Sequence, residues 1–432
     1  MNILFAENKF RADKLGICYL SKIMKDAGHK VDMVQDRIDS IENYIKHNHV
    51  DFIMWSVSSG EQDWVFAKNK DLKDKYKFIS VVGGPHFTYF PEQGEKDPNI
   101  DFVVQGPGEG VILDVVEGRV TSKVIKGHIP NMEQVESPDR SIIYKYEEFG
   151  KSPMKRFMAS RFCKWNCSYC FNHVFRKLYK DESSKTKQIT SVDKIVNEII
   201  DVREKYGLEL AYFNDDNLAQ NKNWLTEFCN RMKQESIKFC GSIRVEDVEE
   251  DTLKTMAESG CVFLNMALES GNPETQKLLR RSGSTFERVK RLAQAAMHYG
   301  IKIRIQNMIG LPVENIIEDA LLTLKCNQEI GPTDSWVSVY QPYGKTDLAE
   351  YCVKQGFITS NYVAQGQYDR SQFKFPESEK IYRLSKWWWF FVVFKVDMEF
   401  VETIIEVPLN DQQMDLVQDL RLKKSKKLLY NL

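Results

Sequence analysis

Three cysteines stand close together in this chain, at Cys163, Cys167 and Cys170, with the spacing C-x3-C-x2-C. The next cysteine along the chain is Cys229, so no fourth thiolate follows nearby. Thiolates suit soft metals and iron–sulfur clusters. A cubane cluster has four irons, so three thiolates leave one iron open, and an open metal position is where chemistry can occur. The spacing therefore favours a cluster with one open iron.

Two other interpretations of these cysteines stay open. His173 lies three residues beyond Cys170, so a compact Cys3His zinc site is conceivable. A disulfide would leave one of the three cysteines unpaired, and a chain with many thiols and no export signal argues against one.

The cysteine segment resembles the signature of radical S-adenosylmethionine (SAM) enzymes, since the aromatic Tyr169 precedes the last cysteine. The resemblance implies that the three cysteines hold a [4Fe–4S] cluster and that SAM chelates the open iron, near Tyr169 and Phe171. It also implies reductive cleavage of SAM to a 5′-deoxyadenosyl radical that abstracts a hydrogen atom. The electron would come from an external donor of the flavodoxin or ferredoxin type, and the protein would supply positioning and shielding.

Composition narrows the class of protein. The 432 residues suffice for two or three domains, and 42% hydrophobic with 28% charged residues is an ordinary globular mixture. With 60 basic and 61 acidic residues the net charge is −1, which does not favour nucleic-acid binding. No apolar run reaches about 18 residues, so no membrane span is expected. The start, Met1 to Lys9, lacks an apolar signal core, so we expect a cytoplasmic location with reduced thiols.

The N-terminal third predicts a Rossmann-like, doubly wound parallel α/β sheet. Short apolar strands alternate with helical stretches such as 15–27. The expected strands are 2–6, 30–34, 51–57, 78–84 and 101–106. Ligands in such sheets bind beyond the C-terminal ends of the strands. Small residues at several of these ends would let a large flat ligand approach the backbone, although any single glycine could simply make a tight turn.

This part of the chain resembles the cobalamin-binding subfamily of radical SAM enzymes, through Val82-Gly83-Gly84-Pro85-His86-Phe87 and Gln105-Gly106-x-Gly108-Glu109. The D-x-H-x-x-G pattern of other cobalamin proteins reads Arg11-x-Asp13-x-x-Gly16 here, so Asp13 stands where a cobalt-ligating histidine would be. His86 is an alternative metal ligand, although a structural role is favoured. The residues that the resemblance assigns to cobalamin are Asn8, Asp13, Gly16, Ser56, Ser58, Gly83, Gly84, Pro85, His86, Gly106 and Glu109.

The central part predicts a partial, TIM-like (β/α)6 barrel. The expected strands are 155–159, 210–214, 239–244, 261–268, 301–308 and 336–340, and the expected helices are 192–206, 223–234, 250–259 and 285–299. Polar residues cluster at the C-terminal strand ends, where barrel enzymes keep their active sites.

These strand ends resemble radical SAM motifs in order along the chain. The resemblance assigns Asp215 and Asp216 to the SAM ammonium group, Arg244 to its carboxylate, Glu269 and Ser270 to the ribose and Gly310 to the adenine. Asn315 replaces the usual threonine after Glu314, and Tyr343-Gly344-Lys345-Thr346 stands for a Pro-Gly-Thr turn. Each acidic residue alone could be a solvated loop carboxylate, but five motifs in order argue against coincidence.

The last 80 residues match no known motif. Residues 380–406 predict one helix that contains the aromatic run Trp387 to Phe391, for which a core or interface role is favoured over substrate contact. The basic stretch 421–427 is interpreted as a solvated tail. We thus expect three domains: a Rossmann-like cobalamin-binding domain (1–140), a radical SAM partial barrel (141–350) and a helical extension (351–432).

The resulting hypothesis is a cobalamin-dependent radical SAM C-methyltransferase. The resemblance implies that methylcobalamin delivers a methyl group to an unactivated carbon of a small-molecule or natural-product substrate. One alternative is a radical SAM cyclase or rearrangement enzyme that uses cobalamin differently or not at all. A remote alternative is a zinc-binding protein without enzymatic activity.

Overall fold

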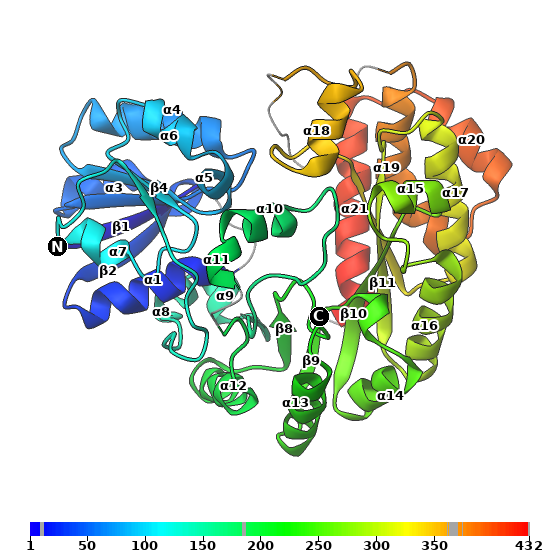
Figure 1. The fold of residues 1–432 in the computed structure, drawn as a ribbon, viewed down its shortest axis with the longest axis horizontal. Helices are drawn as coiled ribbons and strands as arrows, with labels where there is room; N and C mark the ends of the chain where they lie inside the picture. Colours follow the sequence, from blue (N-terminus) through cyan, green and yellow to red (C-terminus); the bar gives the residue numbers. More distant parts are fainter. Residues whose placement is uncertain (9–12, 184–186, 361, 363–369, 374, 431–432) are drawn as a thin grey trace. The chain divides into compact units, whose positions relative to one another are not determined.

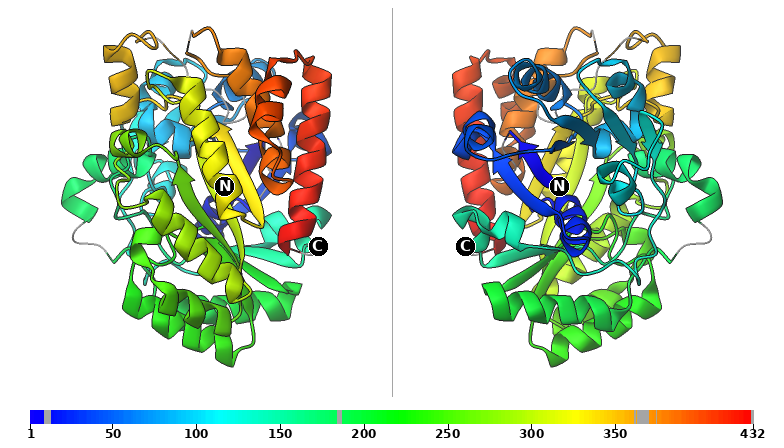
Figure 2. Two further views of the ribbon diagram at one scale, coloured as in Figure 1. Left: turned by 90° about the vertical axis from the view of Figure 1, so that its right-hand side faces the viewer. Right: turned by 90° about the vertical axis from the view of Figure 1, so that its left-hand side faces the viewer.

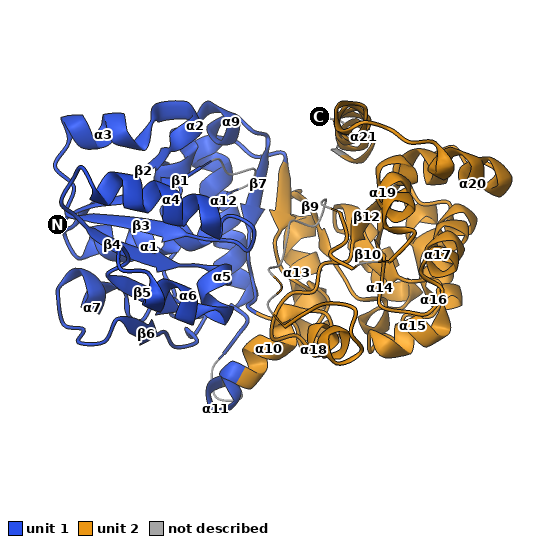
Figure 3. Ribbon diagram, turned by 90° about the horizontal axis from the view of Figure 1, so that it is seen from above, with its two compact units in different colours: residues 1–161, 178–209 blue, residues 162–177, 210–432 orange. Residues whose placement is uncertain are grey.

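The computed structural model describes the chain except for residues 9–12, 184–186, 361, 363–369, 374 and 431–432. It divides into two compact units, shown in Figure 3. The first unit consists of residues 1–161 and 178–209, and the second of residues 162–177 and 210–432. The domain boundaries expected after residues 140 and 350 stay a prediction.

The first unit contains a six-stranded parallel sheet in the order β2-β1-β3-β4-β5-β6 (Figure 1). Its strands are β1 (Asn2–Glu7), β2 (Lys30–Gln35), β3 (Phe52–Ser56), β4 (Ile79–Gly83), β5 (Phe102–Gln105) and β6 (Val124–Lys126). Its main helices are α1 (Leu15–Asp26), α3 (Ile41–His47), α4 (Gln62–Lys73), α5 (Pro85–Tyr89), α6 (Pro91–Lys96), α7 (Ile112–Val116) and α12 (Val192–Tyr206). Shorter elements are α2 (Asp36–Asp39), α8 (Ser141–Tyr144), α9 (Glu147–Gly150), β7 (Met154–Phe157) and α11 (Lys180–Ser183).

Both faces of this sheet are covered by helices. Successive residues of β1 and β3 are buried, whereas a sheet with one wet face would bury only alternate residues. Leu4 and Trp55 join helix residues such as Val65 of α4 in one hydrophobic cluster, which leaves the alternate strand residues to the opposite face. The doubly wound architecture predicted from the strand pattern is confirmed.

The second unit contains parallel strands whose spatial order follows the chain, β8-β9-β10-β11-β12. They are β8 (Leu210–Phe213), β9 (Lys238–Ser242), β10 (Cys261–Glu269), β11 (Lys302–Ile309) and β12 (Asp334–Val339). The helices are α10 (Phe171–Leu178), α13 (Lys222–Gln234), α14 (Glu250–Glu258), α15 (Pro273–Leu278), α16 (Phe286–His298), α17 (Ile316–Ile330), α18 (Asp347–Lys354), α19 (Ser378–Val393), α20 (Met398–Glu406) and α21 (Asp411–Tyr430). Sequential order with helical crossovers is the topology of a (β/α) barrel, and the six strands expected for it are present as β7 to β12.

The C-terminal helices differ from the expectation in two ways. The single helix expected over 380–406 is two helices, because the chain turns at Lys395, whose φ is 48°. The tail interpretation of 421–427 is wrong, since this stretch lies within α21 and buries Arg421 and Ser425. The buried positions recur along one face of α21, and the lysines lie between them.

The aromatic run belongs to the core, as favoured from the sequence. Trp388 and Phe391 are buried in a cluster with residues of α17 and β12. The Trp388 indole donates a hydrogen bond to Ser335 Oγ at 2.8 Å, and the Trp389 indole donates one to Asp334 Oδ1 at 2.6 Å. Figure 2 shows α19 and α21, in orange and red, beside the yellow strand β12. Within the described residues, no helix combines the length and apolar character needed to cross a membrane.

Candidate active site

The cysteine loop is held through Ser168, which is hydrogen-bonded to the C-terminal end of α15 and to the first turn of α18. Ser168 donates from its backbone N–H to the Leu279 carbonyl at 3.2 Å and from its hydroxyl to the Leu278 carbonyl at 2.7 Å. Its own carbonyl accepts a hydrogen bond from the Leu348 N–H at 2.9 Å. Cys167 is buried beside this residue, while Cys163 and Cys170 are partly exposed.

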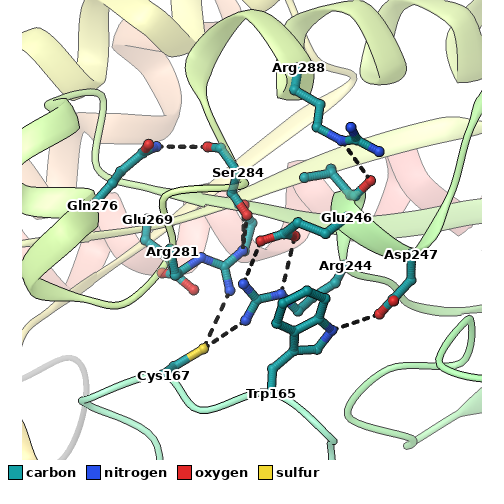
Figure 4. A network of polar contacts seen from close by, with 12 residues as sticks. Trp165, Cys167, Arg244, Glu246, Asp247, Glu269, Gln276, Arg281, Ser284 and Arg288 are labelled. Atoms are coloured by element: carbon teal, nitrogen blue, oxygen red, sulfur yellow. Dashed lines mark hydrogen bonds and ion pairs between the residues drawn. The ribbon is translucent and has the colours of Figure 1, made fainter.

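Two arginines converge on the middle cysteine, as Figure 4 shows. Arg244 Nη1 lies 2.8 Å from Cys167 Sγ, and Arg281 Nη1 lies 3.9 Å from the same sulfur. Glu246 binds the Arg244 guanidinium through both carboxylate oxygens, while Arg281 donates to Ser284 Oγ and to a backbone carbonyl. Two cationic side chains therefore offer N–H donors to one sulfur.

An indole supports the first of these arginines. The Arg244 guanidinium lies over the Trp165 ring, 4.2 Å from its centroid, in cation–π geometry. The indole N–H donates to Asp247 at 2.7 Å, and the same carboxylate accepts from Asn217 at 2.6 Å. Asn217 in turn accepts a hydrogen bond from the backbone N–H of Arg244. The loop after β8 and the loop after β9 thereby fix the arginine beside the cysteine loop.

Tyr169 of the cysteine motif, which is partly buried, forms a hydrogen-bonded pair with the buried Glu269. The phenol donates to Glu269 Oε1 at 2.7 Å, and burial raises the pKa of Tyr169 well above its usual value. Glu269 ends β10 with a φ of 66°, in the left-handed region. The last residue of β10 therefore turns its carboxylate toward the aromatic residue of the cysteine motif.

Two of the three thiols of the cysteine motif have raised pKa values. Burial raises the pKa of Cys170 to about 12 and also raises the pKa of Cys163, so both must lose protons when a metal binds. Among the described residues, no group of three or more histidine, cysteine, aspartate or glutamate side chains converges as the ligands of one ion would.

The zinc interpretation would need His173 beside the cysteines. Its Nε2 instead lies 3.1 Å from Asp347, the first residue of α18. Asp347 also pairs with Lys177 and Arg280, each at 2.7 Å. Partial burial raises the pKa of Asp347, but hydrogen bonds from Lys177 and Arg280 outweigh this effect and lower it to about 2. His173 thus fastens α10 to α18.

The remaining predicted SAM contacts occupy different environments. Asp215 is buried after β8, whereas Asp216 beside it is exposed. The Ser270 hydroxyl donates to Asp319 at 3.0 Å, so it binds the start of α17 in this structure. Gly310 follows β11 directly with a φ of 71°, a conformation that glycine adopts without strain.

In the first unit, the strand order reverses between β1 and β3, and ligands of such folds bind at this point beyond the strand ends. Lys14 lies there and donates to Glu7 Oε2 at 2.8 Å and to the Ser56 carbonyl at 3.3 Å. Burial raises the pKa of Glu7 to about 7 against the attraction of Lys14. Glu7 Oε1 has no hydrogen-bond partner in the part of the chain described, as expected of a group that faces a ligand crevice.

The two candidate cobalt ligands already have protein partners. Asp13 accepts hydrogen bonds from the Tyr144 hydroxyl at 3.0 Å and from the Arg156 N–H at 3.3 Å. His86 uses both ring nitrogens, toward Ser59 at 3.2 Å and toward Gln93 at 2.9 Å. His86 would have to give up a contact to reach a metal, whereas both hydrogen bonds of Asp13 go to Oδ2. Arg11 of the same pattern lies outside the described residues.

The predicted cobalamin residues follow the C-terminal ends of neighbouring strands, Asn8 after β1, Ser56 and Ser58 at β3, Gly83 to His86 at β4, and Gly106 to Glu109 after β5. The glycines differ in what they permit. A Cβ on Gly16 would meet open space, whereas one on Gly84 would lie 2.7 Å from the Val57 nitrogen. Gly84 is therefore required by the chain itself, and Gly16 leaves room for a ligand.

Several residues of these sites escaped sequence reasoning. Arg281 and Glu246 lie in loops outside any matched motif, and only an arginine pair, Arg280-Arg281, hints at a site. Glu7 and Lys14 flank the loop after β1, which includes the predicted cobalamin residues Asn8 and Asp13. Their opposite charges were the one sequence signal that they could pair.

Comparison with known proteins identifies both halves of this arrangement. Residues 158–324 match the radical SAM superfamily, and residues 1–116 match the B12-binding domain. The chain thus carries a B12-binding domain followed by a radical SAM domain. Its cofactors are accordingly a [4Fe–4S] cluster, SAM and cobalamin, and the donor set of three cysteines with two arginines fits the cluster.

Among curated relatives, an uncharacterized methyltransferase of Pyrococcus horikoshii is 25% identical over 374 residues, covering 80% of this chain and 79% of the relative. Cytidylyl-2-hydroxyethylphosphonate methyltransferase of Streptomyces wedmorensis is 23% identical over 65% of this chain. Anaerobic magnesium-protoporphyrin IX monomethyl ester cyclase of Rubrivivax gelatinosus is 23% identical over 62% of it. The chain spans 62% and 52% of these last two relatives.

Two solved structures share the fold. The radical SAM methyltransferase TsrM from Kitasatospora setae matches with a TM-score of 0.66 at 15% identity, covering 82% of this chain and 76% of that one. The cobalamin-dependent radical SAM enzyme OxsB matches with a TM-score of 0.62 at 16% identity, covering 96% and 63%. At these identities the likeness concerns the fold alone.

Proposed function

We propose that this protein is a cobalamin-dependent radical SAM methyltransferase that methylates an unactivated carbon of a small-molecule or natural-product substrate. The observation that carries the proposal is the presence in one chain of a B12-binding match and a radical SAM match around Cys163, Cys167 and Cys170. When bound, the cluster with SAM supplies a radical able to take a hydrogen atom from carbon, and cobalamin supplies the methyl group.

The protein's own residues hold and shield these groups in the proposal. Cys163, Cys167 and Cys170 are the cluster ligands, and Arg244 and Arg281 neutralise the charge gathered at Cys167. Tyr169 and Glu269 would limit water beside the cysteine motif through their hydrogen bond, which would help to shield a reactive radical.

SAM contacts at Phe171, Asp215, Asp216, Glu269, Ser270 and Gly310 are part of the same proposal, as is a cytoplasmic location with a flavodoxin- or ferredoxin-type electron donor. All nine cysteines are free thiols, which is in keeping with a reducing compartment.

The test uses protein prepared without oxygen from cobalamin-fed cells. We expect overlapping corrin and iron–sulfur absorption, with about four irons per chain. Cys167→Ala should lower formation of 5′-deoxyadenosine at least about 100-fold, because the cluster loses a ligand. The matched control is Cys229→Ala in α13, a buried cysteine outside the loop, which should keep the activity.

Methyl transfer is tested separately with SAM that carries a deuterated methyl group, incubated with a metabolite extract of the host. Mass spectrometry should find a product carrying all three deuterons on carbon. A product without label would favour a cyclisation, since three of the matching relatives are cyclases. Deoxyadenosine formation by Cys167→Ala at the wild-type rate would contradict the ligand assignment.

A further inference from the structure

The cysteine loop leaves the first unit at one point and returns to it at another. Residues 162–177 belong to the second unit, while Arg161 before them and Leu178 after them belong to the first. Both flanking stems are held within the first unit by contacts to one short loop, Gly106–Gly110, which follows β5. We call this the β5 loop. It is also a stretch whose sequence pattern was assigned to cobalamin.

The first stem is fixed by a charged pair. Arg161, two residues before Cys163, forms an ion pair with Glu109 of the β5 loop, and both side chains are largely buried. The Arg161 guanidinium also lies 5.6 Å from the ring centroid of Tyr19 in α1. Removal of one partner would leave the other as an uncompensated buried charge, so the position of each segment depends on the other.

The second stem is fixed by a buried tyrosine. Tyr179, which directly follows α10, is 1% exposed and donates its hydroxyl to the Gln105 carbonyl at 3.1 Å. Its ring fills the space above Gly106, where a Cβ would lie 1.8 Å from the hydroxyl oxygen. Lys126 of β6 donates to the Leu178 carbonyl at 3.0 Å and lies 4.8 Å from the Tyr179 ring centroid. The end of α10 is thereby anchored on β5 and β6.

From this arrangement we infer that the β5 loop couples occupancy of the cobalamin site to the order of the cysteine loop, with Glu109 and Tyr179 as positioning residues. The inference rests on the proposed function. A ligand packed against the strand ends restricts the β5 loop, and the two stems carry that restriction to the residues beside the cluster ligands. Coupling between two sites is reciprocal, so a loaded cluster should also tighten cobalamin binding.

This inference gives Glu109 a different role from the sequence-based one. A direct cobalamin contact would need its carboxylate free for the ligand, whereas here the carboxylate pairs with Arg161. Gly106 likewise serves the protein, because only glycine leaves room for Tyr179.

Hydrogen–deuterium exchange of the cluster-loaded protein, with and without hydroxocobalamin, tests the coupling. In the wild type, cobalamin should slow exchange in the peptides at the strand ends, 52–60 and 83–90. It should also slow exchange in the peptides that cover 162–183, about tenfold or more. In Glu109→Gln, cobalamin should bind within threefold of the wild-type Kd and still protect 52–60, while protection of 162–177 is lost. The matched control is Asp114→Asn, which removes an exposed carboxylate of α7 that pairs with Arg119. This variant should show the same protection as the wild type.

A milder variant covers the case in which Glu109→Gln does not fold. Tyr179→Phe deletes only the hydroxyl bonded to Gln105 and leaves no cavity, so it should weaken cobalamin-dependent protection of 178–183 at least threefold. A second readout is the electron spin resonance signal of the reduced cluster, which cobalamin should change in the wild type and leave unchanged in Glu109→Gln.

Two results would overturn the coupling and leave the proposed function intact. In the first, wild-type protein binds both cofactors, yet cobalamin protects only the strand ends. In the second, Glu109→Gln loses cobalamin affinity more than tenfold, which would make Glu109 a direct contact. Wild-type protein that binds no cobalamin would instead contradict the proposed function itself, and the coupling would fail with it.

Discussion

Arg281 lies near Cys167 Sγ without any role assigned to it by a motif, and its proximity has an electrostatic consequence. A cluster gains negative charge on reduction, so a buried cation close to one of its thiolates favours the reduced form. Arg244 contributes in the same sense but also pairs with Glu246, which offsets part of its charge. The charge of Arg281 is also offset in part, by Glu269 and Glu246, but Arg281 is buried and remains close to the sulfur.

We expect Arg281→Met to lower the reduction potential of the cluster by about 90–170 mV, which corresponds to about 2–4 kcal/mol for one electron at separations of about 4–8 Å and an effective dielectric constant near 20. Arg281→Lys keeps the charge and should stay near the wild-type value. Arg288→Met, in which an arginine of α16 bonded to Val245 and Glu249 is removed, is the matched control. The measurement is a redox titration followed by electron spin resonance. Equal potentials in Arg281→Met and the wild type would contradict the argument.

Glu7 gives the first unit a pH dependence of stability. Its folded-state pKa of about 7 lies above the ordinary value of 4.5. The folded protein then binds the proton more tightly than the unfolded chain, so stability falls as pH rises from about 4.5 to 7 and stays level above that.

In Glu7→Gln this contribution disappears. Between pH 5 and pH 8 the wild type should lose about 3 kcal/mol of unfolding free energy relative to the variant. Urea unfolding of cofactor-free protein at several pH values measures the difference. Asp26→Asn, which removes an exposed carboxylate paired with Lys22, should leave the slope unchanged. A slope in Glu7→Gln equal to that of the wild type would show that Glu7 titrates normally.

At the scale of single residues, the sequence located the ligands better than their supports. Cys163, Cys167 and Cys170 stand out because their spacing alone implies chemistry. Arg281 could not be found this way, because its closeness to Cys167 arises from contacts between segments more than 100 residues apart.

At the scale of elements, strands were predicted more accurately than helices. Each expected strand begins and ends within two residues of the observed one, because apolar runs between polar strand ends mark a buried parallel strand clearly. The helix α17 was missed, since it buries polar residues such as Asp319, Thr323 and Asn327 and so lacks an apolar face of the usual kind. Its polar face is explained by partners far away in the chain, such as Asn307 of β11, Ser335 of β12 and Thr275 of α15, which no local pattern reveals.

The aromatic run of α19 contributes to the stability of the second unit. Trp388 is fully buried against β12, and its indole N–H is bonded to Ser335. Trp388→Ala should cost about 3–5 kcal/mol of stability, because a large cavity opens and a buried hydroxyl loses its donor. Phe394→Ala, at a residue that is 67% exposed, should change stability by less than about 0.5 kcal/mol.

The comparison is made by denaturant unfolding, followed through the tryptophan fluorescence of the second unit. Equal stability of the two variants would contradict the core role of the aromatic run and would favour contact with a substrate or partner.

At the scale of the whole molecule, the sequence predicted two α/β sheets and the cofactors that go with them. It could not predict that the cysteine segment belongs to one unit while both of its stems belong to the other. This crossing depends on Glu109 and Tyr179 finding partners far away in the chain, and such pairings emerge only when the whole sheet is assembled.

The conformation of Glu269 has a consequence for the robustness of the protein. Any residue with a side chain is strained in the left-handed region by about 1–2 kcal/mol, whereas glycine is not. Thermal resistance alone would thus be served better without a glutamate at this position. A glycine at this position would relieve the strain, but it would also remove the carboxylate that accepts the hydrogen bond from Tyr169. Heat tolerance and the integrity of the site therefore place opposite demands on this residue.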